Sequence, residues 1–285
     1  METSNPNIQN ERVHIDVESV LESKLPSLKG KLPKFLISYL KKIIHEDEIN
    51  YIFNTYGHLY GVEFADTVMN DHFHINIQTT GEENLPDHSN IIFACNHPLG
   101  GFDGIALISL LGKRYNSIKI PVNDILMYVK NLQEHFIPVN KIQGKGQSRN
   151  TANLIDSVCA SDAPILFFPA GQCSRRQPNG AIRDNEWKKT FISKAKEYKR
   201  DIVPIHFMGE NSKFFYNLSY YRMKLGIKAN IEMLFLSDEL FKQKNKSFSV
   251  IIGKPISYQS LTNEKSDREW AEDIKKISYR LTSNT

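Results

Sequence analysis

Hydrophobic positions along this 285-residue chain follow two spacings, and the change falls near residue 73. Before that point, apolar side chains recur every three or four residues, as they do along one face of a helix. After it, apolar runs of the length of buried strands alternate with helical stretches. We therefore predict two parts, an N-terminal helical segment over residues 1–72 and an α/β domain over residues 73–285.

The second part contains eight apolar runs that are predicted to form strands: Phe73–Thr79, Ile91–Cys95, Ile118–Val122, Phe136–Val139, Ile165–Phe168, Ile202–Phe207, Ile231–Leu236 and Ser249–Ile252. Strands separated by helices usually pair in parallel, because each helix carries the chain back to the starting edge of the sheet. The sequence thus predicts an α/β fold whose mostly parallel sheet is flanked by helices, with a helical N-terminal preface.

Two predicted helices carry apolar stripes. Ser266 and Glu269 form a capping box ahead of a stripe that should pack on the sheet, made of Trp270, Ile274, Ile277 and Leu281. Near the N-terminus, lysines flank a second stripe, made of Phe35, Leu36, Tyr39, Leu40, Ile43 and Ile44. That helix either lies in a membrane interface or packs on the domain with its lysines in solvent, and both interpretations stay open.

Composition describes a globular protein, with 40% hydrophobic and 24% charged residues. The net charge of +4 and isoelectric point near 8.7 suit an anionic lipid surface or an acidic protein partner, and are too weak to predict nucleic-acid binding. The three cysteines lack metal-ligand spacing, and the N-terminus lacks the features of a signal peptide. Both features favour a reducing cytoplasm. No run approaches the roughly 18 apolar residues that span a bilayer, so we expect a protein that is soluble or lies on a membrane.

Candidate chemistry begins directly behind the apolar run Ile91–Cys95. The segment Asn96–Gly104 places His97 and Asp103 on a glycine-rich turn at a predicted strand end, where open α/β sheets carry their active sites. A histidine can accept a proton near neutral pH, and an aspartate on its other ring nitrogen would fix the tautomer. The pair could equally belong to a structural turn in which Asp103 caps the following helix.

A second polar turn, Pro169–Arg176, follows the predicted strand that ends at Phe168. Pro169 ends that strand, and Gly171 allows the backbone to approach a ligand closely. Arg175 and Arg176 supply guanidinium groups suited to a phosphate or a carboxylate. Two such turns behind two buried strands favour an active site over a pair of surface loops.

These motifs resemble those of the glycerolipid acyltransferase superfamily, of the 1-acylglycerol-3-phosphate acyltransferase type. His97 and Asp103 match its histidine–aspartate box, and Phe168–Gly171 matches its phenylalanine–proline–x–glycine loop. Phe136–Lys141 resembles its acceptor-binding block, and Ile202–Ile205 resembles its final strand block. The resemblance implies an acyltransferase that works in membrane lipid synthesis.

The resemblance covers about residues 75–255 and departs from the family pattern at two places. Five residues separate His97 from Asp103 where the family has four, an excess that Gly100 and Gly101 can absorb. The second turn has alanine in place of the loop's usual glutamate, and glutamine or cysteine in place of its threonine. Both departures resemble the branch labelled hemolysin, which includes acyltransferases of amino-acid-containing bacterial lipids and implies no pore.

The resemblance implies that His97, oriented by Asp103, deprotonates an acceptor while the acceptor attacks an acyl thioester. The donor would be acyl-CoA or acyl carrier protein as a co-substrate, with no other cofactor and no metal. The enzyme would bind peripherally to the inner face of the cytoplasmic membrane, where its acceptor arrives. Its substrate-binding residues would be Lys141, Pro169, Gly171, Arg175 and Arg176.

Several functions remain open at this point. The general family implies O-acylation of a lysophospholipid or a glycerol-phosphate-type acceptor, whereas the branch implies N-acylation of an amino acid such as glycine or ornithine. An altered histidine–aspartate box could also leave a lipid-binding protein without catalysis. A covalent route through Cys173 is a further alternative, because the neighbouring Arg175 would favour its thiolate.

Overall fold

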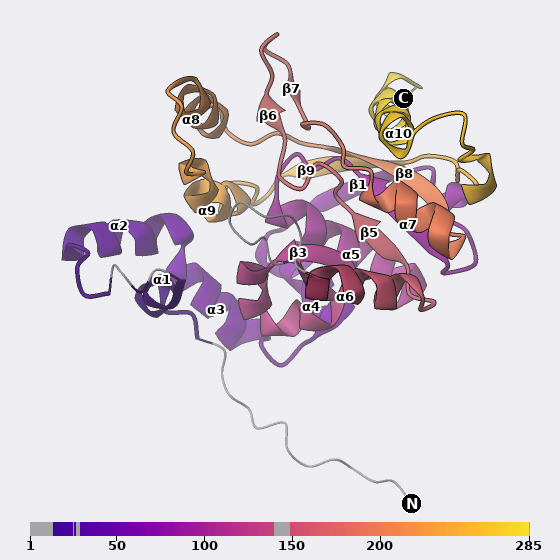
Figure 1. Ribbon diagram of the computed structural model, residues 1–285. Coiled ribbons are helices and arrows are strands. Elements are labelled where there is room, and N and C mark those ends of the chain that lie inside the picture. The colour runs from indigo at the N-terminus through magenta and orange to yellow at the C-terminus, as the bar shows by residue number, and fades with distance from the viewer. Residues whose placement is uncertain (1–13, 25, 27–28, 140–148, 285) are drawn as a thin grey trace, which may run out of the picture.

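The computed structural model describes residues 14–24, 26, 29–139 and 149–284 (Figure 1). Its central five-stranded sheet has the order β1-β9-β8-β2-β5. In that order the strands are Asn76–Thr80, Ser247–Ile252, Asp201–Met208, Ile91–Cys95 and Ile165–Phe167. Neighbours pair in parallel except β8 and β9, which are antiparallel. The predicted α/β fold with a mostly parallel sheet is therefore confirmed.

Two further strands continue the parallel arrangement beyond β5. β3 (Ile120–Asn123) pairs in parallel with β4 (Phe136–Val139). Lys119, immediately before β3, makes a parallel bridge to Ile165 in β5. An antiparallel ribbon of β6 (Arg175–Arg176) and β7 (Ile182–Arg183), which the sequence did not predict, follows β5.

β2 lies inside the sheet, between β8 and β5, and all five of its residues are buried. Successive side chains point to opposite faces of a strand. Ile91, Phe93 and Cys95 accordingly join one hydrophobic cluster, whereas Ile92 and Ala94 join another. This position explains why the strand is apolar throughout, as expected for a parallel strand with both faces covered.

Helices cover both faces of the sheet. The first cluster is completed by α4 (Gly61–Thr67) and α5 (Gly101–Tyr115), and the second by α6 (Arg149–Cys159), α7 (Thr190–Tyr198) and α10 (Asp267–Arg280). In Figure 1, α10 lies above the sheet, and α4 and α5 lie below it. The sheet is thus the middle layer of three.

The helices predicted before residue 73 are present. They are α1 (Val17–Lys24), α2 (Lys34–Ile44), α3 (Glu46–Tyr56) and α4, which continues into a π-helical turn, Val68–His72. Phe53, Phe64 and Met69 belong to the same hydrophobic cluster as the sheet residues Phe93 and Phe207. The later N-terminal helices therefore help to build the main core, and the domain boundary at residues 72 and 73 stays a prediction.

Three elements differ from the prediction. The first strand begins at Asn76 rather than Phe73, because the π-helical turn extends to His72 and His74 has a positive φ of 51°. The run Ile231–Leu236 is not a strand but a 3₁₀ turn, Ile231–Phe235, followed by α9 (Leu236–Phe241). On α10 the capping box forms as predicted, but Ile277 faces solvent rather than the sheet.

Candidate active site

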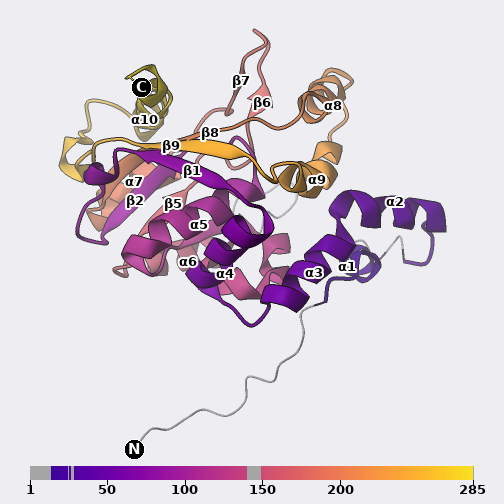
Figure 2. The same cartoon turned by 180° about the vertical axis from the view of Figure 1, so that it is seen from behind.

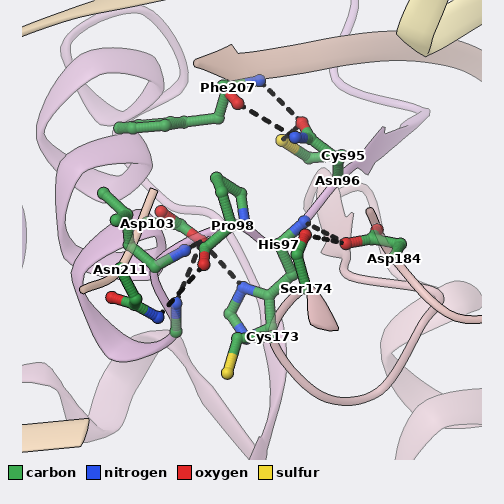
Figure 3. Close-up of polar contacts among 12 residues, drawn as sticks. Cys95, Asn96, His97, Pro98, Asp103, Cys173, Ser174, Asp184, Phe207 and Asn211 are labelled. Carbon is green, nitrogen blue, oxygen red and sulfur yellow. Dashed lines mark hydrogen bonds and ion pairs between the residues drawn. The ribbon is translucent and has the colours of Figure 1, made fainter. Parts of the chain in front are cut away.

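The end of β2 is fixed to its neighbour β8 by the first residue of the glycine-rich turn. The side-chain amide nitrogen of Asn96 donates to the carbonyl oxygen of Phe207 at 2.9 Å, and its oxygen accepts from the Phe207 amide at 2.7 Å (Figure 3). Asn96 is 3% exposed, so this pair of bonds is shielded from water. It holds residues 96–103, which we call the His97 turn, at the carboxyl edge of the sheet.

His97 and Asp103 form a hydrogen-bonded dyad. His97 Nδ1 lies 3.0 Å from Asp103 Oδ2, and the same oxygen accepts from the amides of Leu99 at 3.0 Å and Gly100 at 3.2 Å. The five intervening residues fit because Gly100 has a φ of 88°, a region that L side chains rarely adopt. The lengthened spacing therefore keeps the contact that the sequence analysis expected.

The two members of the dyad differ in their exposure. The side chain of Asp103 is completely buried, whereas that of His97 is 16% exposed. Burial raises the pKa of the Asp103 carboxyl above its usual value, and His97 and the two amides act in the opposite direction. Because Nδ1 is bonded to Asp103, Nε2 is the ring nitrogen left to exchange a proton with a substrate.

The second turn, residues 169–176, lies directly against the His97 turn. The ring of Phe168 stacks on the imidazole of His97 with 4.1 Å between their centroids. The amide of Ser174 donates to the carbonyl oxygen of His97 at 2.7 Å. Gly171, with a φ of 69°, turns the chain by donating its amide to Phe168 at 2.9 Å. The structure thus joins the two predicted turns into one site.

Asp184 connects the two turns and was missed by the sequence analysis. Its Oδ1 accepts from the backbone amide of His97 at 3.3 Å and from the Ser174 hydroxyl at 2.6 Å (Figure 3). Its Oδ2 accepts from the indole of the buried Trp187 at 2.8 Å. A lone aspartate 87 residues away from His97 gives no signal of this role in a single sequence.

Arg175 is placed differently from the prediction of a substrate-binding cation. It is 2% exposed, donates to the carbonyl oxygen of Cys173 at 2.8 Å and pairs with Glu232 at 3.3 Å. Glu232 is fully buried and also pairs with Arg222 at 2.7 Å. The guanidinium of Arg175 is therefore engaged inside the protein, and this geometry favours a structural role.

The other predicted substrate-binding residues have varied surroundings. Arg176 is exposed, donates to Asn217 at 3.0 Å and lies over the ring of Tyr220. Pro169 is buried, whereas Gly171 is exposed. Lys141 lies outside the described residues. The substrate-binding role of these residues stays a prediction.

Cys173 lacks the environment of a nucleophile. Its side chain is buried, and burial raises the pKa of the thiol to about 11, although the neighbouring Arg175 acts in the opposite direction. A reactive cysteine needs a lowered pKa and access to its substrate. The burial of Cys173 thus does not support the covalent alternative and favours direct transfer to the acceptor.

Comparison with known proteins identifies the family of the chain, which the geometry alone does not. A family model described as Acyltransferase matches residues 19–285. The chain belongs to this acyltransferase family. The predicted superfamily and the predicted acyltransferase activity are thereby confirmed, and the interpretation as a lipid-binding protein without catalysis is not supported.

Two curated relatives are similar over almost their whole length. A lyso-glycine lipid O-acyltransferase from Bacteroides thetaiotaomicron is 47% identical over 268 residues, which cover 94% of this chain and 97% of the relative. A protein of the same name from Phocaeicola vulgatus is 44% identical over 268 residues, which cover 94% and 95%. Among solved structures, the 1-acyl-sn-glycerophosphate acyltransferase PlsC from Thermotoga maritima aligns over 94% of both chains, with 11% identity and a TM-score of 0.44.

Proposed function

We propose that this acyltransferase transfers a fatty acyl group to a hydroxyl oxygen of a lyso-glycine lipid. The hydrogen-bonded dyad of His97 and Asp103, with its 3.0 Å contact, supports the chemistry. The acceptor follows from the two relatives of that name, which are 44–47% identical to this chain. The proposal keeps the O-acylation expected from the general family and the amino-acid lipid expected from the branch.

In the proposed reaction, His97 acts as a general base. Nε2 takes the proton of the acceptor hydroxyl as its oxygen attacks the thioester carbonyl carbon, and Asp103 stabilises the imidazolium that forms. The tetrahedral intermediate then collapses with cleavage of the carbon–sulfur bond. The proton on Nε2 passes to the departing sulfur, which leaves an ester, a free thiol and neutral His97.

The donor in this proposal is acyl-CoA or acyl carrier protein, and its carbonyl needs hydrogen-bond donors for the developing oxyanion. Gly171 and Ser174 already donate their amides to Phe168 and His97. The amides between them, at Gln172 and Cys173, are therefore the donors we propose. They lie on the turn whose preceding residue, Phe168, stacks on His97.

A glycine lipid carries a carboxylate, so its binding site should include a cation. Lys188 is exposed, and a Cβ placed on Gly171 would lie only 2.8 Å from its Nζ. Lys188 therefore extends along the second turn, close to the residues proposed to hold the oxyanion. We propose Lys188 and Arg176 as the groups that bind the acceptor carboxylate.

The proposed location is the inner face of the cytoplasmic membrane, where the lipid acceptor and the thioester donor can meet. Within the part of the chain that the structure describes, no helix combines the length and apolarity required to cross a bilayer. We propose peripheral attachment because the acceptor is a lipid.

The proposed function is tested by acyl transfer with purified protein. Labelled acyl-CoA and acyl carrier protein are offered with lyso-glycine lipid, lysophosphatidic acid, glycerol phosphate, glycine and ornithine, and products are identified by mass spectrometry. We expect a product from lyso-glycine lipid that is lost in His97→Ala and kept in His58→Ala, which changes an exposed histidine. Transfer to glycine or ornithine nitrogen would instead support N-acylation, and transfer to the phosphate-bearing acceptors would support the general-family reaction.

A further inference from the structure

Exposed apolar side chains concentrate in one short part of the chain. Residues 213–234, which we call the arm, consist of α8 (Lys213–Lys224), the segment that follows it and the first four residues of the 3₁₀ turn Ile231–Phe235. Eight large apolar side chains of the arm are 38–74% exposed: Phe214, Tyr221, Met223, Leu225, Ile227, Ile231, Met233 and Leu234. Such a concentration of exposed apolar side chains is typical of a surface that binds a partner.

The charged groups on the surface of the arm all have one sign. Glu232 is its only acidic residue, and it is fully buried against Arg175 and Arg222. Lys213, Lys224 and Lys228 are exposed. The arm therefore offers solvent an apolar surface with basic groups and no exposed carboxylate, a combination that complements anionic lipid headgroups.

α2 adds a second piece with the same character. It packs against the 3₁₀ turn and α9, and it contains no acidic residue. Its stripe is only partly used for packing, since Leu40 and Ile43 are buried while Phe35 is 76% exposed and Tyr39 is 49% exposed. Both opposite views place α2, α8 and α9 at the same side of the molecule (Figure 1, Figure 2).

The inner side of this region touches the catalytic turns. Leu236, directly after the 3₁₀ turn, packs in one cluster with Cys173 and Phe215. A Cβ built on Gly100 of the His97 turn would lie 3.2 Å from Leu236 Cδ2. Leu236, two residues after the last exposed apolar residue of the arm, therefore links this region to the turn that carries the dyad.

We propose that the arm and α2 form one docking surface that seats the enzyme on an anionic lipid bilayer, next to His97. Aromatic and aliphatic side chains such as Phe35, Phe214 and Leu225 enter the interface, and the lysines contact the headgroups. This inference rests on the proposed function in one respect, because a bilayer-resident acceptor needs a path to the dyad. Seated in this way, the protein takes its acceptor from the membrane without releasing the lipid into water.

The docking surface is tested with vesicles of phosphatidylcholine alone or mixed with phosphatidylglycerol. One variant combines Lys213→Glu, Lys224→Glu and Lys228→Glu, and another combines Phe35→Ser and Leu225→Ser. All five positions are exposed, so both variants should fold. We expect wild type to sediment with the anionic vesicles, and the charge variant to lose at least about 100-fold in vesicle affinity. Lys254→Glu and Ile277→Ser, exposed residues outside this surface, are the matched controls and should bind as wild type.

Activity assays separate this inference from the proposed function. The variants should acylate lyso-glycine lipid dispersed in detergent at the wild-type rate, and should fail when the same lipid is embedded in vesicles. Vesicle binding without any product from lyso-glycine lipid would overturn the proposed function and leave the docking surface standing. Wild-type vesicle binding by both variants would overturn the docking surface, as would a dimer in light scattering that the variants convert to monomer.

Discussion

One carboxylate oxygen of Asp103 both bonds the ring of His97, which it orients, and accepts from the two backbone amides just ahead of α5. In Asp103→Asn, a side-chain oxygen can still accept from the Leu99 and Gly100 amides, but the neutral amide no longer stabilises the imidazolium. We expect kcat to fall roughly 10²- to 10⁴-fold. Steady-state kinetics and circular dichroism of the folded variant check this, and a kcat near that of wild type would rule out the dyad mechanism.

Asp184 acts through other residues, because its bonds reach the backbone of His97 and the hydroxyl of Ser174. Asp184→Asn keeps the size of the side chain but replaces one of its acceptor oxygens with a donor. We expect kcat to fall about tenfold or more with little change in the acceptor KM, because the two turns shift relative to each other.

The control for this variant is Glu186→Gln, two residues further along, whose carboxylate is exposed and pairs with Arg268. It should keep the wild-type kcat. Ser174→Ala removes one of the bonds to Asp184 and should give an intermediate kcat. If Asp184→Asn lowers only the melting temperature and leaves kcat unchanged, Asp184 has no part in positioning His97.

Among the elements, the second turn and the arm are joined by the buried charges of Arg175, Glu232 and Arg222. Removing one partner of a buried ion pair leaves an uncompensated charge, so Glu232→Gln should lower the free energy of unfolding by about 3–5 kcal/mol. Arg175→Met should also destabilise the protein, and the double variant should lose less than the sum of the two. Urea unfolding measures all three.

Catalysis provides a second readout for the same element. If Arg175 is structural, Arg175→Met should leave the acceptor KM almost unchanged when the protein is assayed well below its melting temperature. A large rise in KM without loss of stability would instead restore the substrate-binding role that the sequence predicted for Arg175.

The spacing of apolar residues predicted an element correctly where the burial of that element is the usual one for its spacing. β2 is apolar throughout because both its faces are covered, and the capping box at Ser266 forms within four residues. The run Ile231–Leu236 is apolar except for Glu232, but it forms a 3₁₀ turn and the start of α9, and Ile231, Met233 and Leu234 face outward. Apolar residues on an exposed surface and in a buried strand give the same pattern, so sequence alone could not separate them.

The residues of the site were likewise predictable only where their contacts are local in the sequence. His97 and Asp103 could be found because they are six residues apart in one turn, and the second turn because it follows a strand of the same sheet. Asp184 and Lys188 could not be found, since their contacts depend on how the chain after β7 returns to the site. Arg175 was assigned by its residue type, which gives no information on whether Glu232 already holds its charge.

For the molecule as a whole, buried histidines should make stability depend on pH. Burial lowers the pKa of His206 from its ordinary value of 6.5 to about 4, and lowers those of His72 and His135 as well. As pH falls below about 6.5, the unfolded chain therefore takes up protons before the folded protein does. The stability contribution of His206 is complete above pH 6.5 and is lost towards pH 4, by about 3 kcal/mol in total.

Urea unfolding at pH 7.5 and pH 5 checks this expectation. The difference between the two midpoints should be smaller in His206→Gln than in wild type, whereas His58→Gln, at an exposed position, should leave the difference unchanged. Equal differences in all three proteins would mean that His206 does not contribute to the acid sensitivity.

The position of β2 between β5 and β8 has a consequence during synthesis on the ribosome. Asn96 completes its bonds only with Phe207, 111 residues later, and the five buried residues of β2 need strands from both later segments. At ordinary elongation rates β2 therefore emerges on the order of 10 s before β8 can cover it. Until then the nascent chain carries an uncovered apolar strand next to an unformed dyad, so a ribosome stalled before residue 207 would hold an inactive chain that chaperones should recognise.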